Sequence, residues 1–252
     1  MRKRTVRRIL LAVAVPVFLF SGVMVAKYHR EMSAESKYME TLVEMAVTVS
    51  AEASGDQSVQ EAAGELPIEV DFDVLCKENQ NVVGWLYCPD TPINYPVVQA
   101  ADNDFYLHRL LDGSYNAAGS LFMDYRNSAD FSDWNSVIYG HNMRYDSMFG
   151  TLPDYKAQSY FEAHPVIFLL TPEQNYKINL LAGFVTPANA GLYSAFNPSE
   201  GKRASFVEKW MNASDFDSAS VPVPGCKFIT LSTCSYEYSN ARYVVVGILE
   251  EV

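Results

Sequence analysis

Cysteine and histidine are scarce in this sequence of 252 residues, which contains four of each. Separations of 12, 138 and 8 residues divide the four cysteines, which are Cys76, Cys88, Cys226 and Cys234. This spacing holds neither a Cys-x-x-Cys redox pair nor the paired knuckles of a zinc site, and four cysteines are too few for a disulfide framework. The sequence therefore predicts no metal site and no cofactor.

Positive charge is also scarce beyond the first eight residues. Five of the 19 basic residues precede position 9, and the other 14 face 30 acidic residues, which gives the rest of the chain a net charge of −16. A segment with this much negative charge repels nucleic acid and anionic membrane surfaces. With 49% hydrophobic and 19% charged residues, the chain is too apolar for disorder and long enough for one domain with a sizeable core.

One long stretch lacks charge altogether. It runs for 18 residues from Ile9 to Ala26 and would cover about 27 Å as a helix, close to the hydrocarbon thickness of a bilayer. A cleaved secretory signal is the alternative, but Met24-Val25-Ala26-Lys27 makes a poor cleavage site. We therefore predict a transmembrane signal anchor at 9–26, with the basic residues of 1–8 holding that end in the cytoplasm.

Aromatic residues are absent from Ala51 to Glu65, a segment rich in Ala, Glu, Ser, Gln and Gly. It offers almost no large apolar side chain to bury, although packing against a domain remains the alternative. A helical pattern runs from Tyr28 to about Val49. We interpret 27–66 as an extracellular stalk and linker, and 67–252 as one extracellular domain that begins at Pro67.

Short β-branched and aromatic runs, separated by Gly, Pro, Asn and Asp, fill this domain. Asp71 could cap a short helix through Glu78, and helical patterns recur at Tyr155–Ala163 and Glu200–Asn212. Many short strands with few helices favour a mostly β fold, a closed barrel with peripheral helices, and a sandwich is the alternative. The eight predicted strands are Val82–Tyr87, Ile93–Gln99, Gly119–Asp124, Ser136–His141, Val166–Thr171, Tyr176–Thr186, Lys227–Cys234 and Arg242–Glu250.

Three residues at predicted strand ends could carry chemistry. Cys234 ends the apolar run Thr230-Leu231-Ser232-Thr233-Cys234, where a thiol could act as a nucleophile or simply fill space. Arg242 opens the next strand, so a hairpin would bring it to the same rim, where a guanidinium could favour a thiolate or bind an oxyanion. His141 ends another strand and could act as general acid and base.

These residues and their surroundings resemble class B sortases. The histidine of the Tyr-Gly-His-Asn segment precedes the cysteine of the Thr-Leu-Ser-Thr-Cys strand by 93 positions, and the arginine follows one hairpin later. The resemblance covers Phe72 to Glu250. Five further segments agree in order and spacing: Val82–Leu86, Ile93–Gln99, Asp102–Leu107, Gly119–Arg126 and Ser147–Gly150.

The resemblance implies an eight-stranded sortase-type barrel and a cysteine transpeptidase on the outside of a Gram-positive-type cell. Such an enzyme cleaves the sorting signal of a secreted protein after Thr and transfers the protein to an amine of the cell wall or to a pilin lysine. It implies Cys234 as nucleophile, His141 as acid and base, and Arg242 on the substrate or oxyanion. The positions that match the peptide groove of class B enzymes are Asn103, Leu107, Tyr139 and Ser232.

Relatives of class B accept signals of the Asn-Pro-x-Thr-Asn type or the Ser/Pro-Pro-x-Thr-Gly type, and the sequence does not choose between them. In some members an acidic residue follows the cysteine directly, whereas here Glu237 comes third, which puts in doubt a carboxylate that orients His141. Two other functions stay open. One is a cell-wall cysteine peptidase or amidase, and the other is a non-catalytic, membrane-anchored binding domain.

Overall fold

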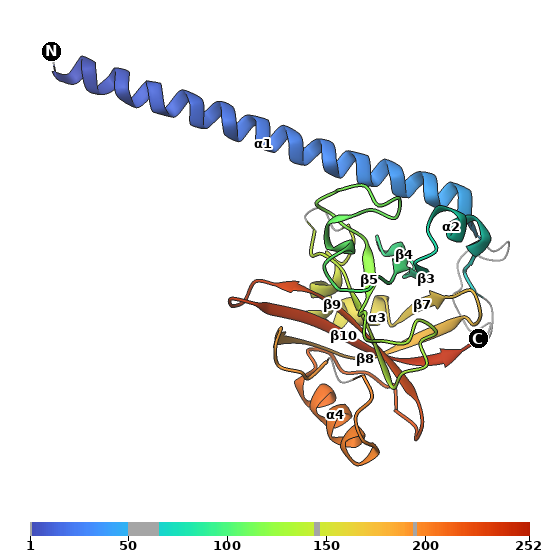
Figure 1. Ribbon diagram of the computed structural model, residues 1–252. Helices are drawn as coiled ribbons and strands as arrows, with labels where there is room; N and C mark the ends of the chain where they lie inside the picture. Colours follow the sequence, from blue (N-terminus) through green and yellow to red (C-terminus); the bar gives the residue numbers. More distant parts are fainter. Residues whose placement is uncertain (1, 50–65, 144–146, 194–195) are drawn as a thin grey trace.

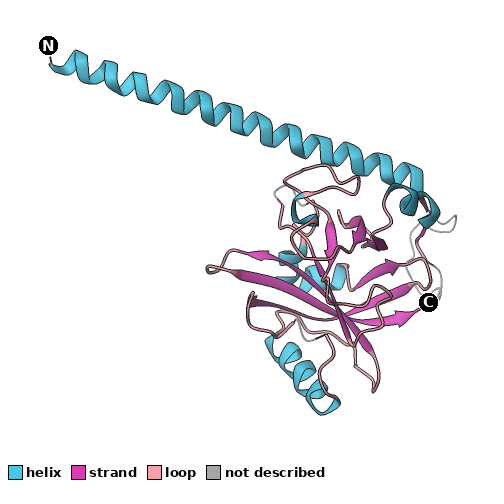
Figure 2. Cartoon of the chain, viewed as in Figure 1, coloured by secondary structure: helices cyan, strands magenta, loops and turns pink. Residues whose placement is uncertain are grey.

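Eight strands of the chain close into a barrel, in the order β10-β8-β7-β3-β4-β5-β6-β9 (Figures 1 and 2). The computed structural model describes residues 2–49, 66–143, 147–193 and 196–252, with side chains from Leu10 onward. The predicted barrel is confirmed, and the alternative of a sandwich is wrong. The strands are β3 (Val82–Tyr87), β4 (Asn94–Val98), β5 (Leu121–Met123), β6 (Asn135–Tyr139), β7 (Val166–Leu170), β8 (Tyr176–Pro187), β9 (Lys227–Ser235) and β10 (Ala241–Glu251).

Side chains along β10 alternate between two hydrophobic cores. Tyr243 and Val245 belong to a core to which all eight strands contribute, which is the barrel interior, whereas Val244 and Val246 belong to a core outside it. The helix α4 (Glu200–Ala213) contributes Trp210 to the outer core, and this ring stacks on Trp134 at 5.3 Å between centroids. Because successive strand residues face opposite sides, the same alternation decides which site residues face outward.

The short helices lie at the periphery of the barrel (Figure 2). In α2 (Phe72–Glu78) the predicted cap is present, since Asp71 accepts a hydrogen bond from the backbone of Val74 at 3.1 Å. The helical region predicted at 155–163 is divided between a 3₁₀ turn, η3 (Leu152–Lys156), and α3 (Gln158–Ala163). A second 3₁₀ turn, η1 (Tyr106–His108), follows β4.

A single long helix, α1 (Arg2–Ala46), contains the whole predicted anchor and continues beyond it (Figure 1). Its most apolar window of 18 residues has a mean hydropathy of 2.1, and none of that window is buried. By length and composition this helix can cross a membrane. The helix does not end where the predicted stalk begins, at residue 27.

The second half of α1 packs against the domain. Leu42 and Ala46 are buried in a core with Ile68 and Leu75. Directly after the helix, β1 (Val47–Val49) pairs with β2 (Ile68–Val70) in an antiparallel sheet that the sequence did not predict. The stretch interpreted as a stalk therefore contributes packing up to Val49, whereas its low-complexity part, 51–65, lies outside the described residues.

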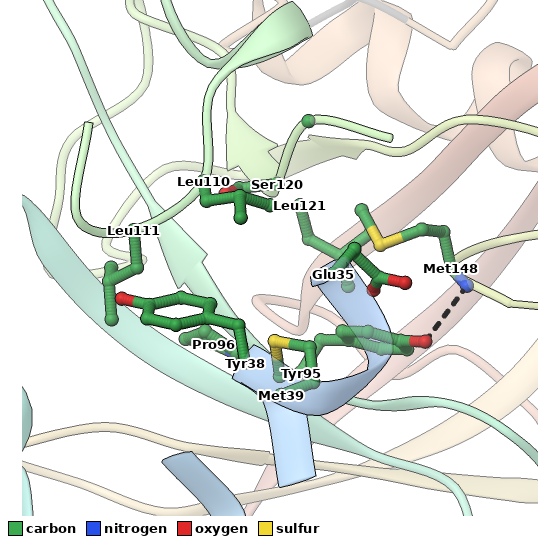
Figure 3. Close-up of a pocket in the computed structure, with 11 residues that line it drawn as sticks. Glu35, Tyr38, Met39, Tyr95, Pro96, Leu110, Leu111, Ser120, Leu121 and Met148 are labelled. Atoms are coloured by element: carbon green, nitrogen blue, oxygen red, sulfur yellow. Dashed lines mark hydrogen bonds between the residues drawn. The ribbon is translucent and has the colours of Figure 1, made fainter. Parts of the chain in front are cut away.

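A small cavity lies between α1 and the barrel, with Glu35 on its wall (Figure 3). Its volume, about 10 Å³ for the centre of a water-sized sphere, is room for about one water molecule. Glu35 is only 4% exposed, and its Oε1 has no hydrogen-bond partner among the described residues. Burial raises the pKa of this carboxyl to about 7. On the barrel side, the Tyr95 hydroxyl accepts a hydrogen bond from the backbone of Met148 at 3.2 Å.

Candidate active site

Two parallel strands bring the predicted base and nucleophile to one edge of the barrel. β6 pairs with β9 so that Tyr139 is level with Ser232, and His141 and Cys234 each follow two positions later. The Thr233 hydroxyl donates to the Gly140 carbonyl at 2.8 Å, and the Asn142 amide donates to the Cys234 carbonyl at 2.8 Å. The backbone after β6 is therefore bonded directly to the strand that carries the thiol.

Arg242 stands opposite Cys234 across the β9–β10 ladder, as the predicted hairpin requires. Residues directly opposite in antiparallel strands have Cβ atoms about 5 Å apart and project from the same face. Tyr243 points into the barrel, so Arg242 and Cys234 face outward. Both residues are half-buried, and the Arg242 Nη1 donates to the Ala241 carbonyl at 3.0 Å.

The imidazole of His141 is held by a backbone carbonyl. Its Nε2 lies 2.8 Å from the Leu107 oxygen, and because a carbonyl only accepts, Nε2 is the protonated nitrogen. The ring also stacks on His108 at 5.6 Å between centroids. Burial and the nearby His108 hold the pKa of His141 below its ordinary value, although the hydrogen bond to Leu107 opposes them. In the neutral ring, Nδ1 has no hydrogen-bond partner among the described residues and can accept a proton.

Among the residues that the structure describes, no carboxylate hydrogen-bonds to His141. Glu237, the acidic residue of the hairpin loop, instead pairs with Lys156 and accepts a hydrogen bond from the Ser235 hydroxyl. These two partners lower the pKa of Glu237 to about 2. The orientation of the imidazole thus depends on the Leu107 carbonyl.

The four predicted groove residues lie around this edge. Asn103 and Tyr139 both donate to one oxygen of Asp124, at 3.1 and 2.9 Å. Leu107 supplies the carbonyl that holds His141, and Ser232 pairs with Tyr139 across the β6–β9 ladder. The structure therefore brings all seven predicted site residues to one region of the barrel.

Asp124 itself was not singled out from the sequence. It follows β5 and is fully buried. Burial alone would raise its pKa, but hydrogen bonds from Arg126, Asn103 and Tyr139 lower the pKa below the ordinary value, and the group stays ionised. Only its position at the end of a predicted strand could have distinguished it from the 29 other acidic residues.

Tyr193 was also not predicted. It lies between β8 and α4, is 4% exposed, and its hydroxyl donates to the Ala188 carbonyl at 3.1 Å. Burial raises the pKa of this phenol, while the nearby positive charge of Arg242 opposes the rise. Tyr193 therefore lies near Arg242 and belongs to the outer core that also contains Trp210.

Comparison with known proteins agrees with this geometry. The family model of the sortase domain matches residues 86–250. Sortase B of Listeria monocytogenes is 35% identical over 241 residues, which cover 94% of each chain. Among solved structures, sortase B from B. anthracis in complex with AAEK1 is 29% identical, with a TM-score of 0.72 over 89% of this chain and all of that one. A Staphylococcus aureus sortase B-substrate complex is also 29% identical, with a TM-score of 0.68 over 72% of this chain and 85% of that one. The chain belongs to the sortase family, and within it to class B.

Proposed function

We propose that Cys234, His141 and Arg242 carry out the reaction of this cysteine transpeptidase. The observation that supports this assignment most directly is the register of β9, which pairs Cys234 with Arg242 on one side and Ser232 with Tyr139 on the other. A strand with partners on both sides is a rigid platform for a nucleophile. Cys234 and Arg242 lie on paired strands, and His141 follows β6, the other strand that pairs with β9, which supports a shared site.

In the first step, the Nδ1 of His141 takes the proton of the Cys234 thiol, and the sulfur bonds to the carbonyl carbon of the substrate threonine. The carbonyl oxygen gains negative charge, which Arg242 stabilises by hydrogen bonding. When the tetrahedral species collapses, the peptide C–N bond breaks and His141 gives a proton to the departing amine. The products are a thioacyl enzyme and the carboxyl-terminal fragment of the sorting signal.

In the second step, an acceptor amine attacks the thioester carbon and His141 takes its proton. The C–S bond breaks, an amide forms, and the thiol is restored. The Nδ1 of the neutral His141 suits this second role because Nε2 already donates to Leu107. We propose a peptide amine of the cell wall as acceptor, with a pilin lysine as the alternative.

The peptide groove is proposed to involve Asn103, Leu107, Tyr139 and Ser232. Their location around Cys234 and His141 supports this assignment. We propose a secreted protein with a signal of the Asn-Pro-x-Thr-Asn or Ser/Pro-Pro-x-Thr-Gly type as the substrate.

Membrane attachment by residues 9–26 is proposed to leave residues 1–8 in the cytoplasm and the barrel outside, as a single-pass protein. The basic residues before the apolar run and the exposed apolar surface of α1 support this orientation. Protease treatment of intact cells should remove the barrel and spare the amino terminus. Protection of the barrel would contradict the orientation.

The decisive experiment uses the full chain in detergent, because α1 packs on the barrel. It is incubated with peptides of both signal types, with and without amines, and analysed by mass spectrometry. We expect an acyl adduct on Cys234 that an amine converts to an amide, in wild type and in Cys226→Ala, but not in Cys234→Ala. Release of acid only, even with amine present, would instead favour the peptidase or amidase. Full cellular function of Cys234→Ala would favour the non-catalytic binding domain.

A further inference from the structure

Both oxygens of the buried Asp124 carboxylate are occupied by hydrogen-bond donors. Oδ1 accepts from the backbone nitrogen and the Nε of Arg126, at 3.0 and 2.8 Å. Oδ2 accepts from the Arg126 Nη2 at 2.7 Å, the Tyr139 hydroxyl at 2.9 Å and the Asn103 amide at 3.1 Å. A fully buried charge is tolerated when hydrogen-bond donors replace the water that it has lost, as they do around Asp124.

Two of these donors belong to the proposed peptide groove but come from different elements. Asn103 lies in the connection between β4 and η1, and Tyr139 ends β6. The backbone of Tyr125 also donates to the Asn103 Oδ1 at 3.0 Å, so the segment 124–125 holds both ends of this amide. The carboxylate is thus the shared partner that fixes the distance between the two side chains.

The ion pair extends this support to a third segment. The Arg126 guanidinium lies over the ring of Phe196, at 4.6 Å from the ring centroid. Phe196 belongs to the connection between β8 and α4. One carboxylate therefore ties together the β4–η1 connection, the end of β6 and the β8–α4 connection.

We propose that Asp124 is a positioning residue for the peptide substrate: it holds Asn103 and Tyr139 in the orientation in which they contact the sorting signal. This inference rests on the proposed peptide groove, and it adds Asp124 as the residue that orients two of the groove side chains. Asp124 itself does not touch the reacting atoms. Its loss should therefore weaken substrate binding and leave the intrinsic reactivity of Cys234 unchanged.

The test compares Asp124→Asn with Asp133→Asn in the full chain. Asp133 is a matched control because it is also buried and accepts hydrogen bonds from Asn127 and Asn197, at 2.7 and 2.6 Å, with no bond to the groove residues. Both variants should lower the melting temperature. Only Asp124→Asn should raise KM for the peptide, by tenfold or more, with kcat within threefold and the rate of Cys234 alkylation by iodoacetamide within twofold of wild type.

An equal rise of KM in both variants would overturn the proposal, because the effect would then be a general loss of stability. A fall of kcat at constant KM would overturn it as well. Failure of the proposed function is a separate result: wild type itself would form no acyl adduct on Cys234.

A second measurement serves if Asp124→Asn does not fold. Asn103→Ala and Tyr139→Phe should each raise KM, and the double variant should raise it by much less than the product of the two changes, since both act through one carboxylate. Independent effects that multiply would overturn the shared role of Asp124.

Discussion

Arg242 lies directly opposite Cys234 in the β9–β10 ladder, and the pair projects from the outer face of the barrel. Two residues fixed by ladder register cannot drift apart without breaking the strand pairing. The ladder thus fixes the spacing of the two backbones, and the proposed stabilisation of an oxyanion by the Arg242 guanidinium depends on that spacing.

Replacing Arg242 by Ala should lower kcat by about 100-fold or more, because a preorganised oxyanion donor is lost. Arg242→Lys should recover only part of this activity, since an ammonium lacks the planar fork of donors. Steady-state kinetics with a sorting peptide measures both. Lys227→Ala is the control, because Lys227 is a basic residue at the far end of the neighbouring strand β9; it should stay within twofold of wild type. Full activity of Arg242→Ala would contradict the assigned role.

The stacked pair of His108 and His141 predicts a pH effect. Burial and His108 hold the pKa of His141 below its ordinary value, so the neutral imidazole persists to lower pH than in a free histidine. His108→Gln removes the neighbouring imidazole and should shift the acidic limb of the kcat/KM profile to higher pH, because the pKa of His141 then rises. His164→Gln, remote from this stack, should leave the limb in place. An unchanged limb in both variants would show that His108 does not influence the titrating group.

Gly140 predicts a steric effect on the histidine. A Cβ at this position would lie 2.4 Å from the Leu121 Cδ2 and 2.6 Å from the Phe149 Cδ2, so either these buried side chains or the backbone next to His141 would have to move. Gly140→Ala should lower kcat/KM at least tenfold, while the circular dichroism spectrum still reports a folded barrel. Gly201→Ala in α4, where a methyl group meets open space, is the control and should keep full activity.

Glu35 predicts that stability falls as the pH rises. Its pKa is near 7 in the fold against an ordinary value of 4.5, so the folded state holds the proton more tightly. The full stabilisation is present below pH 4.5, where both states are protonated, and is lost as the pH rises through about 7. The loss amounts to at most about 3 kcal/mol. Tyr38 and Tyr95 also face the cavity, and burial raises the pKa of both phenols, so neither titrates in this range.

The measurement is the free energy of unfolding of the full chain at pH 5 and pH 8. Glu35→Gln should remove most of the difference and be the more stable protein at pH 8. Glu44→Gln on the exposed side of the same helix should behave like wild type. If the wild-type protein has the same free energy of unfolding at both pH values, the predicted contribution of Glu35 is refuted.

Local patterns predicted the strands, because each is a short β-branched or aromatic run between turn residues. They favoured a barrel over a sandwich, and the resemblance to class B sortases implied the eight-stranded barrel. The resemblance to class B sortases predicted Cys234, His141 and Arg242 as one site, and the register of β9 brings them together. The pairing of β1 with β2 could not be predicted in the same way, since it joins three-residue segments on either side of 50–67. The role of Asp124 depends on partners 21 residues before and 15 residues after it, which no local pattern records.

In the proposed membrane orientation, the docking of α1 determines the height of the site above the bilayer. The Asn116 amide donates to the Glu31 carbonyl of the helix at 2.9 Å, and the Asn116 backbone donates to the His108 carbonyl at 3.1 Å, next to the Leu107 carbonyl that holds His141. Glu31 is five residues beyond Ala26, or about 7–8 Å of helix. With 9–26 in the bilayer, the imidazole is connected through a few hydrogen bonds to a point just above the lipid. The active site then lies at a fixed distance from the bilayer. A membrane-anchored substrate must present its cleavage site at that same distance.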